Sequence, residues 1–177
     1  MGNTDAMFNL AACYMNGDSV SQDKKKAMEL YQRATNLGDT DAMINLALCY
    51  MNGDSVSQDK NKVIELLQRA TDMGNTHGMV NLALCYLKGD GVSQDKKKAI
   101  KLYQRATDLG DTEAMALLGL CYEKGYGISQ DKKKAIELYQ RAADMGNKYA
   151  LAQLNRQDKM MPIHDLTEDQ LLTHSIG

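Results

Sequence analysis

One block of residues, Cys-Tyr-x-x-Gly, occurs four times in this chain at an interval of 36 residues. It begins at Cys13, Cys49, Cys85 and Cys121. Two further blocks keep the same interval: Ser-Gln-Asp-Lys begins at Ser21, Ser57, Ser93 and Ser129, and Gln-Arg-Ala begins at Gln32, Gln68, Gln104 and Gln140. A fixed period of this length indicates a solenoid of stacked supersecondary units, not a globular fold around a central site. The chain is therefore expected to present an extended surface.

Each unit has the pattern of two helices. In the second unit, residues 41–52 contain no Gly or Pro and place apolar residues on one helical face, at Ala42, Leu46, Cys49 and Tyr50. Thr40 is the expected N-cap, and Gly53 is expected to end the helix in a left-handed conformation.

A polar link follows, and Asp59 is expected to cap or charge the start of a second helix. The apolar face of that helix is formed by Val63, Leu66, Leu67 and Ala70, and Gly74 closes it. Short links make the two helices antiparallel neighbours.

The sequence thus predicts an all-α solenoid of four helix-turn-helix repeats. The repeats are expected at residues 2–37, 38–73, 74–109 and 110–145. A half repeat at residues 146–157 follows, whose single helix, Lys148–Arg156, has a polar outer side and suits a C-terminal cap. Residues 158–177 depart from the pattern.

The fourth unit resembles a known family, the Sel-1-like repeat, which is related to the tetratricopeptide repeat. The resemblance rests on Ala114, Leu118-Gly119, Tyr122, Gly125, Gly127-Ile128, Asp131, Ala135, Leu138-Tyr139, Arg141-Ala142-Ala143 and Gly146. It implies a right-handed α/α superhelix that acts as an adaptor or scaffold for other proteins.

The other units depart from the family pattern in two places. Ala11, Ala47 and Ala83 replace the glycine of Leu-Gly, and Ser19 and Ser55 replace the second loop glycine. Each repeat also has one cysteine where the secreted, cysteine-rich branch of the family has two. The chain therefore lacks the disulfides of that branch, and the branch's reported penicillin binding is carried over only weakly.

The cysteines are also expected to be unpaired on geometric grounds. Equivalent atoms of adjacent repeats should lie at least about 8–10 Å apart, whereas a disulfide requires Cα atoms within about 7 Å. We therefore expect small buried thiols. Together with the absence of a visible signal peptide, reduced thiols favour an intracellular, cytoplasmic location.

The composition argues against several classes of function. The formal net charge is -2, from 21 Lys+Arg and 23 Asp+Glu, so no global field favours nucleic acid. No apolar run is long enough to insert into a membrane. His77, His164 and His174 are scattered, and no catalytic or phosphate-binding motif occurs. We expect no enzyme activity, no cofactor and no metal.

The expected partner is a protein or peptide, bound on a concave face lined by the first helix of each repeat. Helical spacing away from the core selects Asp5, Asn9, Asp41, Asn45, Leu48, Asn52, His77, Asn81, Leu84, Lys88, Glu113, Leu117, Leu120 and Lys124. The asparagines offer a donor and an acceptor to an extended peptide backbone. Alternatively, they cap or bond neighbouring helices.

Three other recurring residue types have both a structural and a functional interpretation. The lysine runs at Lys24–Lys26, Lys60/Lys62, Lys96–Lys98 and Lys132–Lys134 form either a solvated convex edge, which we favour, or a ridge for an acidic partner. The tyrosines of the Cys-Tyr block are expected to pack in the core with a satisfied hydroxyl. Met7, Met28, Met43, Met79 and Met115 are expected to be core residues.

The last nineteen residues contain seven apolar residues and a possible capping box at Thr167 to Gln170. We expect residues 168–174 to form a short helix and the segment 159–177 to dock, either over the last repeat or on another copy of the chain. This gives a first alternative function, a structural or self-associating module. A second alternative is a carbohydrate- or peptidoglycan-binding module, for which only Tyr126 and Tyr149 offer exposed aromatic groups.

Overall fold

The computed structural model describes the backbone of residues 2–158 and the side chains of residues 4–156. Every element within the described range is an α-helix. The helices are α1 (Gly2–Asn16), α2 (Lys24–Asn36), α3 (Thr40–Asn52), α4 (Lys60–Asp72), α5 (Thr76–Lys88), α6 (Lys96–Asp108), α7 (Thr112–Lys124), α8 (Lys132–Asp144) and α9 (Lys148–Asp158). The predicted all-α solenoid of four helix pairs followed by one helix is confirmed. The predicted helix at 168–174 lies outside the described residues.

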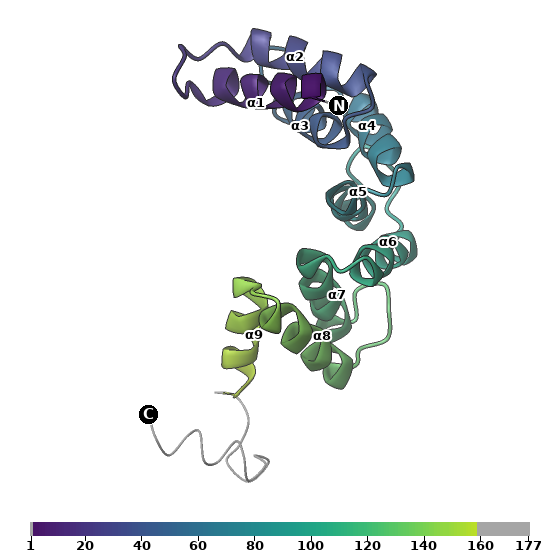
Figure 1. The fold of residues 1–177 in the computed structure, drawn as a ribbon. Helices are drawn as coiled ribbons and strands as arrows, with labels where there is room; N and C mark the ends of the chain where they lie inside the picture. Colours follow the sequence, from purple (N-terminus) through teal and green to yellow (C-terminus); the bar gives the residue numbers. More distant parts are fainter. Residues whose placement is uncertain (1, 159–177) are drawn as a thin grey trace.

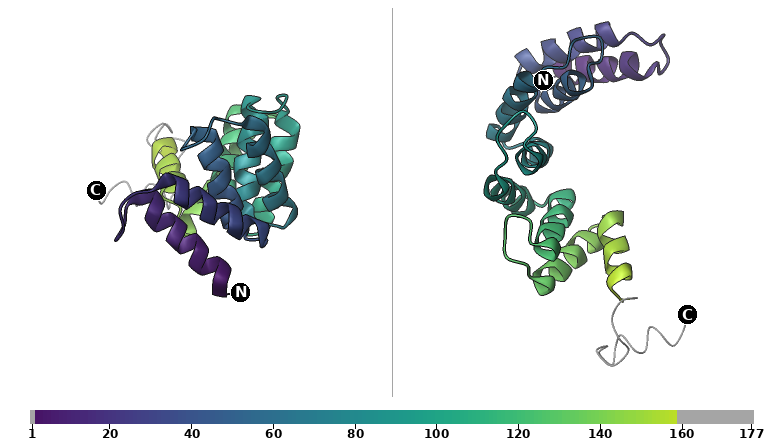
Figure 2. Two further views of the ribbon diagram at one scale, coloured as in Figure 1. Left: turned by 90° about the horizontal axis from the view of Figure 1, so that it is seen from above. Right: turned by 180° about the vertical axis from the view of Figure 1, so that it is seen from behind.

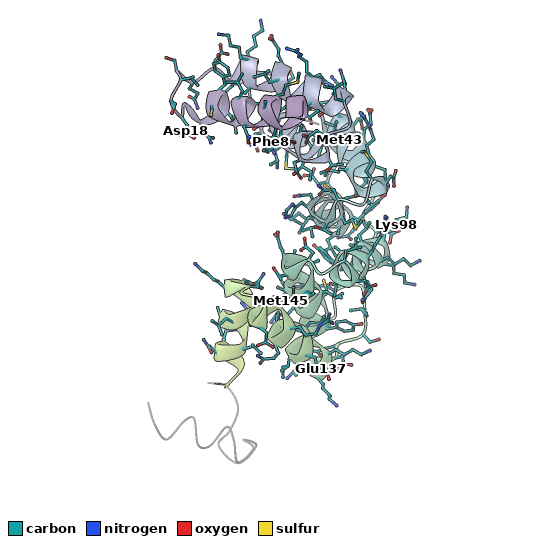
Figure 3. The ribbon with its side chains drawn as sticks, in the orientation of Figure 1. Phe8, Asp18, Met43, Lys98, Glu137 and Met145 are labelled. Carbon is teal, nitrogen blue, oxygen red and sulfur yellow. The ribbon has the colours of Figure 1, made fainter. Side chains whose placement is uncertain are left out.

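The pairs stack into a curved arc (Figure 1). The odd-numbered helices lie on the inner side of the curve and the even-numbered helices on the outer side, as the view from behind also shows (Figure 2). Lys98 of α6 and Glu137 of α8 lie on this outer side (Figure 3). We therefore call α1, α3, α5, α7 and α9 the inner helices and α2, α4, α6 and α8 the outer helices.

The turn from an outer to an inner helix is very short and depends on glycine. Gly38 has φ 90° and donates its N–H to Thr35, while Asp39 donates to the carbonyl of Ala34 at 3.1 Å. This pair of bonds is the Schellman arrangement, which requires a left-handed residue after the helix. The side chain of Asp39 then accepts from the N–H of Ala42 and caps α3. The predicted N-cap, Thr40, is wrong because Thr40 is already the first residue of the helix.

The other predicted helix ends are confirmed. Gly53 is left-handed, with φ 76°, and bonds to Cys49. Asp59 accepts from the N–H groups of Asn61 and Lys62 and caps α4. Its own N–H donates to the carbonyl of Tyr50, which ties the loop back to the inner helix. The same pattern recurs in the later repeats, so the period of the sequence is also the period of the hydrogen bonds.

The core lies between the inner and outer layers. The predicted methionines are buried, at 0% exposure for Met43 and Met79 and 2% for Met115. At position 119, where three units have alanine, the fourth unit has glycine. A Cβ on Gly119 would lie 2.9 Å from the ring of Tyr139. The first and third repeats have alanine at this position together with the equivalent tyrosine, Tyr31 or Tyr103, so the inner and outer helices of the fourth repeat approach each other in a way that alanine would disturb.

Candidate peptide-binding groove

The inner helices carry every residue that the sequence predicts for the binding face. Most of these side chains are exposed, while Asn45, Asn81, Leu84, Leu117 and Leu120 are half-buried. Leu48 is 39% exposed. The solvent-accessible residues of the inner helices therefore include amides, charged groups and aliphatic side chains.

The alternative role of the asparagines, bonding to neighbouring helices, does not describe the bonds of Asn45 and Asn81. Asn45 donates its side-chain amide to the carbonyl of Asp41 at 2.9 Å, and Asn81 donates to that of His77 at 2.9 Å. Both bonds lie within a single helix, one turn back, so these asparagines do not join neighbouring helices. Each bond fixes the side chain and leaves the amide oxygen as an acceptor.

A different asparagine links repeats. Asn75, the N-cap of α5, donates to Thr40 Oγ1 and to Asp41 Oδ1, both at 2.9 Å. Asn147 similarly donates to the carbonyl of Thr112 at 3.1 Å. The side chains of the equivalent caps Asp39 and Asp111 have no N–H group to donate. These bonds were not predicted, although Asp and Asn alternate at this position of the sequence.

The lysine runs have structural partners that the favoured interpretation, a solvated edge, did not include. Lys24 pairs with Asp54 at 2.6 Å and Lys60 with Asp90 at 2.8 Å, and each pair joins consecutive repeats. The lysine at the third position of each run lies over a tyrosine ring of the same repeat. The ammonium-to-centroid distances are 5.3, 4.6, 5.2 and 5.4 Å for Lys26–Tyr14, Lys62–Tyr50, Lys98–Tyr86 and Lys134–Tyr122.

These contacts are within the range of cation–π attraction. The tyrosines are half-buried and pack beside the core. The expected bond for the hydroxyl is found at Tyr50, which accepts from Lys62 Nζ at 3.3 Å. Regular spacing of Lys twelve residues after Tyr could have predicted the ring contacts.

The cysteines are free thiols. Cys49, Cys85 and Cys121 are buried and Cys13 is half-buried. Burial raises the pKa of Cys49 and of Cys121 to about 11, which disfavours the reactive thiolate. Across the residues that the structure describes, no three His, Cys, Asp or Glu side chains gather as a metal site, and no helix could cross a membrane.

The family model for the Sel1 repeat matches residues 4–39, 40–75, 76–111 and 112–147. The chain belongs to the Sel1 repeat family. Members of this family are generally non-catalytic scaffolds for protein interactions. Among curated proteins, no significant match is found.

Solved Sel1 structures resemble this one. The protective antigen c5321 of uropathogenic Escherichia coli, which displays an SLR fold, is 31% identical with a TM-score of 0.81. The match covers 90% of this chain and 34% of that protein. A Sel1 repeat protein from Oxalobacter formigenes is 32% identical with a TM-score of 0.79, over 85% of this chain and 62% of that one.

Helicobacter pylori cysteine rich protein B is 27% identical with a TM-score of 0.59, over 77% of this chain and 98% of that one. The chain spans about a third of the Escherichia coli protein and under two thirds of the Oxalobacter protein. The comparisons thus establish the family and the repeat architecture.

Proposed function

We propose that this Sel1 protein is an adaptor that holds an extended segment of a partner protein along its inner helices. The observation that carries the proposal is the ladder of solvent-accessible amides on the inner helices. Asn9, Asn45 and Asn81 recur at one position of α1, α3 and α5. Amide oxygens at a regular spacing suit a peptide backbone, whose N–H groups also recur regularly.

The apolar residues beside this ladder supply a second kind of contact. Leu48, Leu84, Leu117 and Leu120 add aliphatic surface toward the C-terminal end of the groove. Acidic residues begin α1, α3 and α7, whereas Lys88 and Lys124 end α5 and α7. The two borders of the groove therefore differ in charge, which favours one orientation of a charged peptide.

The experiment is affinity capture from the source lysate, read by mass spectrometry. The baits are the wild type, Asn45→Arg/Asn81→Arg, and a matched control, Gln104→Arg/Gln140→Arg, which adds the same charge on the outer helices. We expect a partner that the wild type and the control hold and the asparagine variant loses, with equal helicity by circular dichroism. Equal capture by all three proteins would contradict the proposal.

A second candidate function is self-association or docking through residues 159–177. Leu151 on α9 is 52% exposed, although its equivalents Met43, Met79 and Met115 are buried. Tyr149 is 44% exposed on the same helix, so α9, which directly precedes this segment in the sequence, has exposed apolar surface. Sedimentation of the full chain and of Leu171→Ser/Leu172→Ser tests the idea. An unchanged mass and an unchanged melting temperature would contradict it.

A further inference from the structure

One charged position distinguishes the outer helix of the third repeat from the other three. The helix α6 has Lys101 there, whereas α2, α4 and α8 have glutamate, at Glu29, Glu65 and Glu137. Residues four apart are neighbours on the surface of an α-helix, so Lys97, Lys101 and Arg105 form one line along α6. All three are exposed, and we call them the basic stripe. In each of the other outer helices, a glutamate interrupts this line.

The basic stripe makes no ion pair with another described residue. The two acids nearest to it along the chain have structural partners. Asp95 caps α6 by accepting from the N–H of Lys98, and Asp108 accepts from the amide of Gln104 at 2.9 Å. Asp108 lies one turn beyond Arg105, so its charge acts mainly on that end of the stripe. Like charges four residues apart destabilise a helix slightly, and an acidic ligand would remove this repulsion.

A cavity of about 290 Å³ lies between α6 and α8. Leu118 and Tyr122 of α7 and Leu138 of α8 supply its apolar lining, and its polar lining consists of Gln104, Lys134, Glu137 and Arg141. Glu137 lies on the outer side of the arc (Figure 3), so the cavity belongs to the outer surface. The volume is below the range of small-molecule sites, about 300–1,000 Å³. It suits one apolar side chain of a peptide.

The basic stripe stands beside this cavity, as the first repeat shows by equivalence. The corresponding cavity after α2 is lined by Met28, Glu29, Gln32, Arg33, Leu46 and Tyr50. Lys101 and Arg105 are the counterparts of Glu29 and Arg33, so they border the α6 side of the later cavity. The exchange of glutamate for lysine therefore reverses one charge of that wall. The opposite wall has the cations Lys134 and Arg141 and the single acid Glu137.

We infer that the basic stripe and the adjoining cavity form a second docking surface, whose ligand is an acidic segment of a partner protein with one apolar anchor residue. The anchor fills the cavity over Leu118, and carboxylates on either side of it pair with the stripe and with Arg141. Complementary charge of this kind gives specificity and a salt-sensitive association. The apolar lining and Glu137 favour a peptide over a uniformly anionic nucleic acid. The surface lies on the outer helices and is thus separate from the groove proposed above.

The probe is a fluorescently labelled synthetic peptide with one central Leu and a run of Glu on each side. Its binding to the full chain is measured by anisotropy in about 0.1 M salt, where charges more than about 10 Å apart are largely screened. Lys101→Glu installs the residue of the other three repeats, so the fold should be kept, and binding should weaken at least about tenfold. The control Lys25→Glu makes the same change of charge on α2 and should alter binding less than about twofold.

A second variant moves the site to another repeat. Glu29→Lys in the Lys101→Glu protein gives α2 the uninterrupted line of charge that α6 has in the wild type, beside the corresponding cavity. Binding of the probe should return to within about threefold of the wild type. Binding that stays lost would contradict the inference, because the line of charge and the cavity would then not be sufficient.

Other results would also overturn the inference: no binding of the probe, binding that Lys101→Glu leaves unchanged, or equal binding of peptides with Gln in place of Glu or Ser in place of Leu. Tighter binding of a single-stranded oligonucleotide would overturn it too, because the ligand would then be a nucleic acid. The groove variant Asn45→Arg/Asn81→Arg should bind the probe as the wild type does. Failure at the basic stripe is therefore distinct from failure of the proposed groove.

Discussion

The third and fourth repeats contain equivalent tyrosines with different surroundings. Tyr103 and Tyr139 are 36 residues apart in the sequence, and both are fully buried. The hydroxyl of Tyr139 donates to Glu123 Oε2 at 2.9 Å, whereas the hydroxyl of Tyr103 has no hydrogen-bond partner among the described residues. The cause is one residue of the inner helix, because Leu87 occupies in the third repeat the place that Glu123 has in the fourth.

Glu123 also organises the end of the solenoid. It pairs with Lys124 at 2.8 Å and with Arg156 of α9 at 3.4 Å. The carboxylate therefore connects α7, α8 and α9 through three different donors. The comparison shows that a repeat can keep its fold and its buried tyrosine while one substitution decides whether the core contains a satisfied polar network or an unsatisfied hydroxyl.

The largest expected effect is the loss of the satisfied hydrogen bond. Tyr139→Phe removes a donor to a mostly buried carboxylate and should lower the free energy of unfolding by about 2 kcal/mol. Urea denaturation followed by circular dichroism measures it. A double-mutant cycle with Glu123→Gln isolates the pair, and a coupling energy near zero would show that the bond contributes nothing.

In the third repeat, the equivalent substitution should change the free energy of unfolding in the opposite direction. Tyr103→Phe removes a buried hydroxyl that has no hydrogen-bond partner among the described residues and should raise the free energy of unfolding by about 1 kcal/mol. The same denaturation experiment tests it, with Tyr126→Phe as the exposed control. If Tyr103→Phe were destabilising by as much as Tyr139→Phe, the two tyrosines would not differ in the way we describe.

The pH dependence of stability should differ between the two repeats. Burial acts to raise the pKa of Glu123, but hydrogen bonds from Lys124 and Tyr139 and the charge of Arg156 bring it below its ordinary value of 4.5. A lowered folded-state pKa stabilises the protein above pH 4.5, and this contribution is lost as the pH falls below that value. The difference in stability between the wild type and Glu123→Gln should therefore decrease on acidification. Thermal melts of both proteins at pH 7, 5 and 3 measure it.

In the third repeat the uncharged Leu87 can make no such contribution. Leu87→Gln, the matched substitution, should shift stability by the same amount at each pH. A constant difference between wild type and Glu123→Gln over this range would contradict the prediction.

The smallest effect concerns the joint between the third and fourth repeats. Asp54 and Asp90 pair with a lysine of the preceding repeat, but Tyr126 stands at the next equivalent position and Lys96 has no ion pair with a described residue. Tyr126→Asp should supply the missing pair and stabilise the protein by about 0.5 kcal/mol. Tyr126→Asn is the control, and a gain that high salt does not reduce would exclude the ion pair as its cause.

Much of the fold was predictable because the sequence repeats itself. Four copies of each apolar face, with glycine and aspartate at fixed positions, define the helices, their ends and the stacking. The N-cap was misplaced by one residue since Thr40 and Asp39 are both good capping residues, and only the geometry of the preceding Schellman turn makes Asp39 the cap.

The site was less predictable, for two physical reasons. Helical spacing identifies which residues face away from the core, but the bonds of Asn45 within its own helix depend on rotamers that spacing does not determine. The exposed residues Leu37, Met73, Leu109 and Met145 lie at helix ends, where a pattern based on helical faces does not apply. Contacts that differ between repeats, such as Glu123 with Tyr139, are hidden by an analysis that looks for what repeats share.

The polar links between repeats are distributed unevenly along the arc. The first joint has the pair Lys24–Asp54, and the second has both Lys60–Asp90 and the bonds of Asn75. Neither kind of link occurs at the third joint in the described structure. There, Gly127 lets the loop approach Lys96 so closely that a Cβ on Gly127 would lie 2.6 Å from the Cβ of Lys96. The third joint thus depends on apolar packing between α6 and α7 and on this close backbone contact, so its stability should respond less to added salt than that of the first two joints.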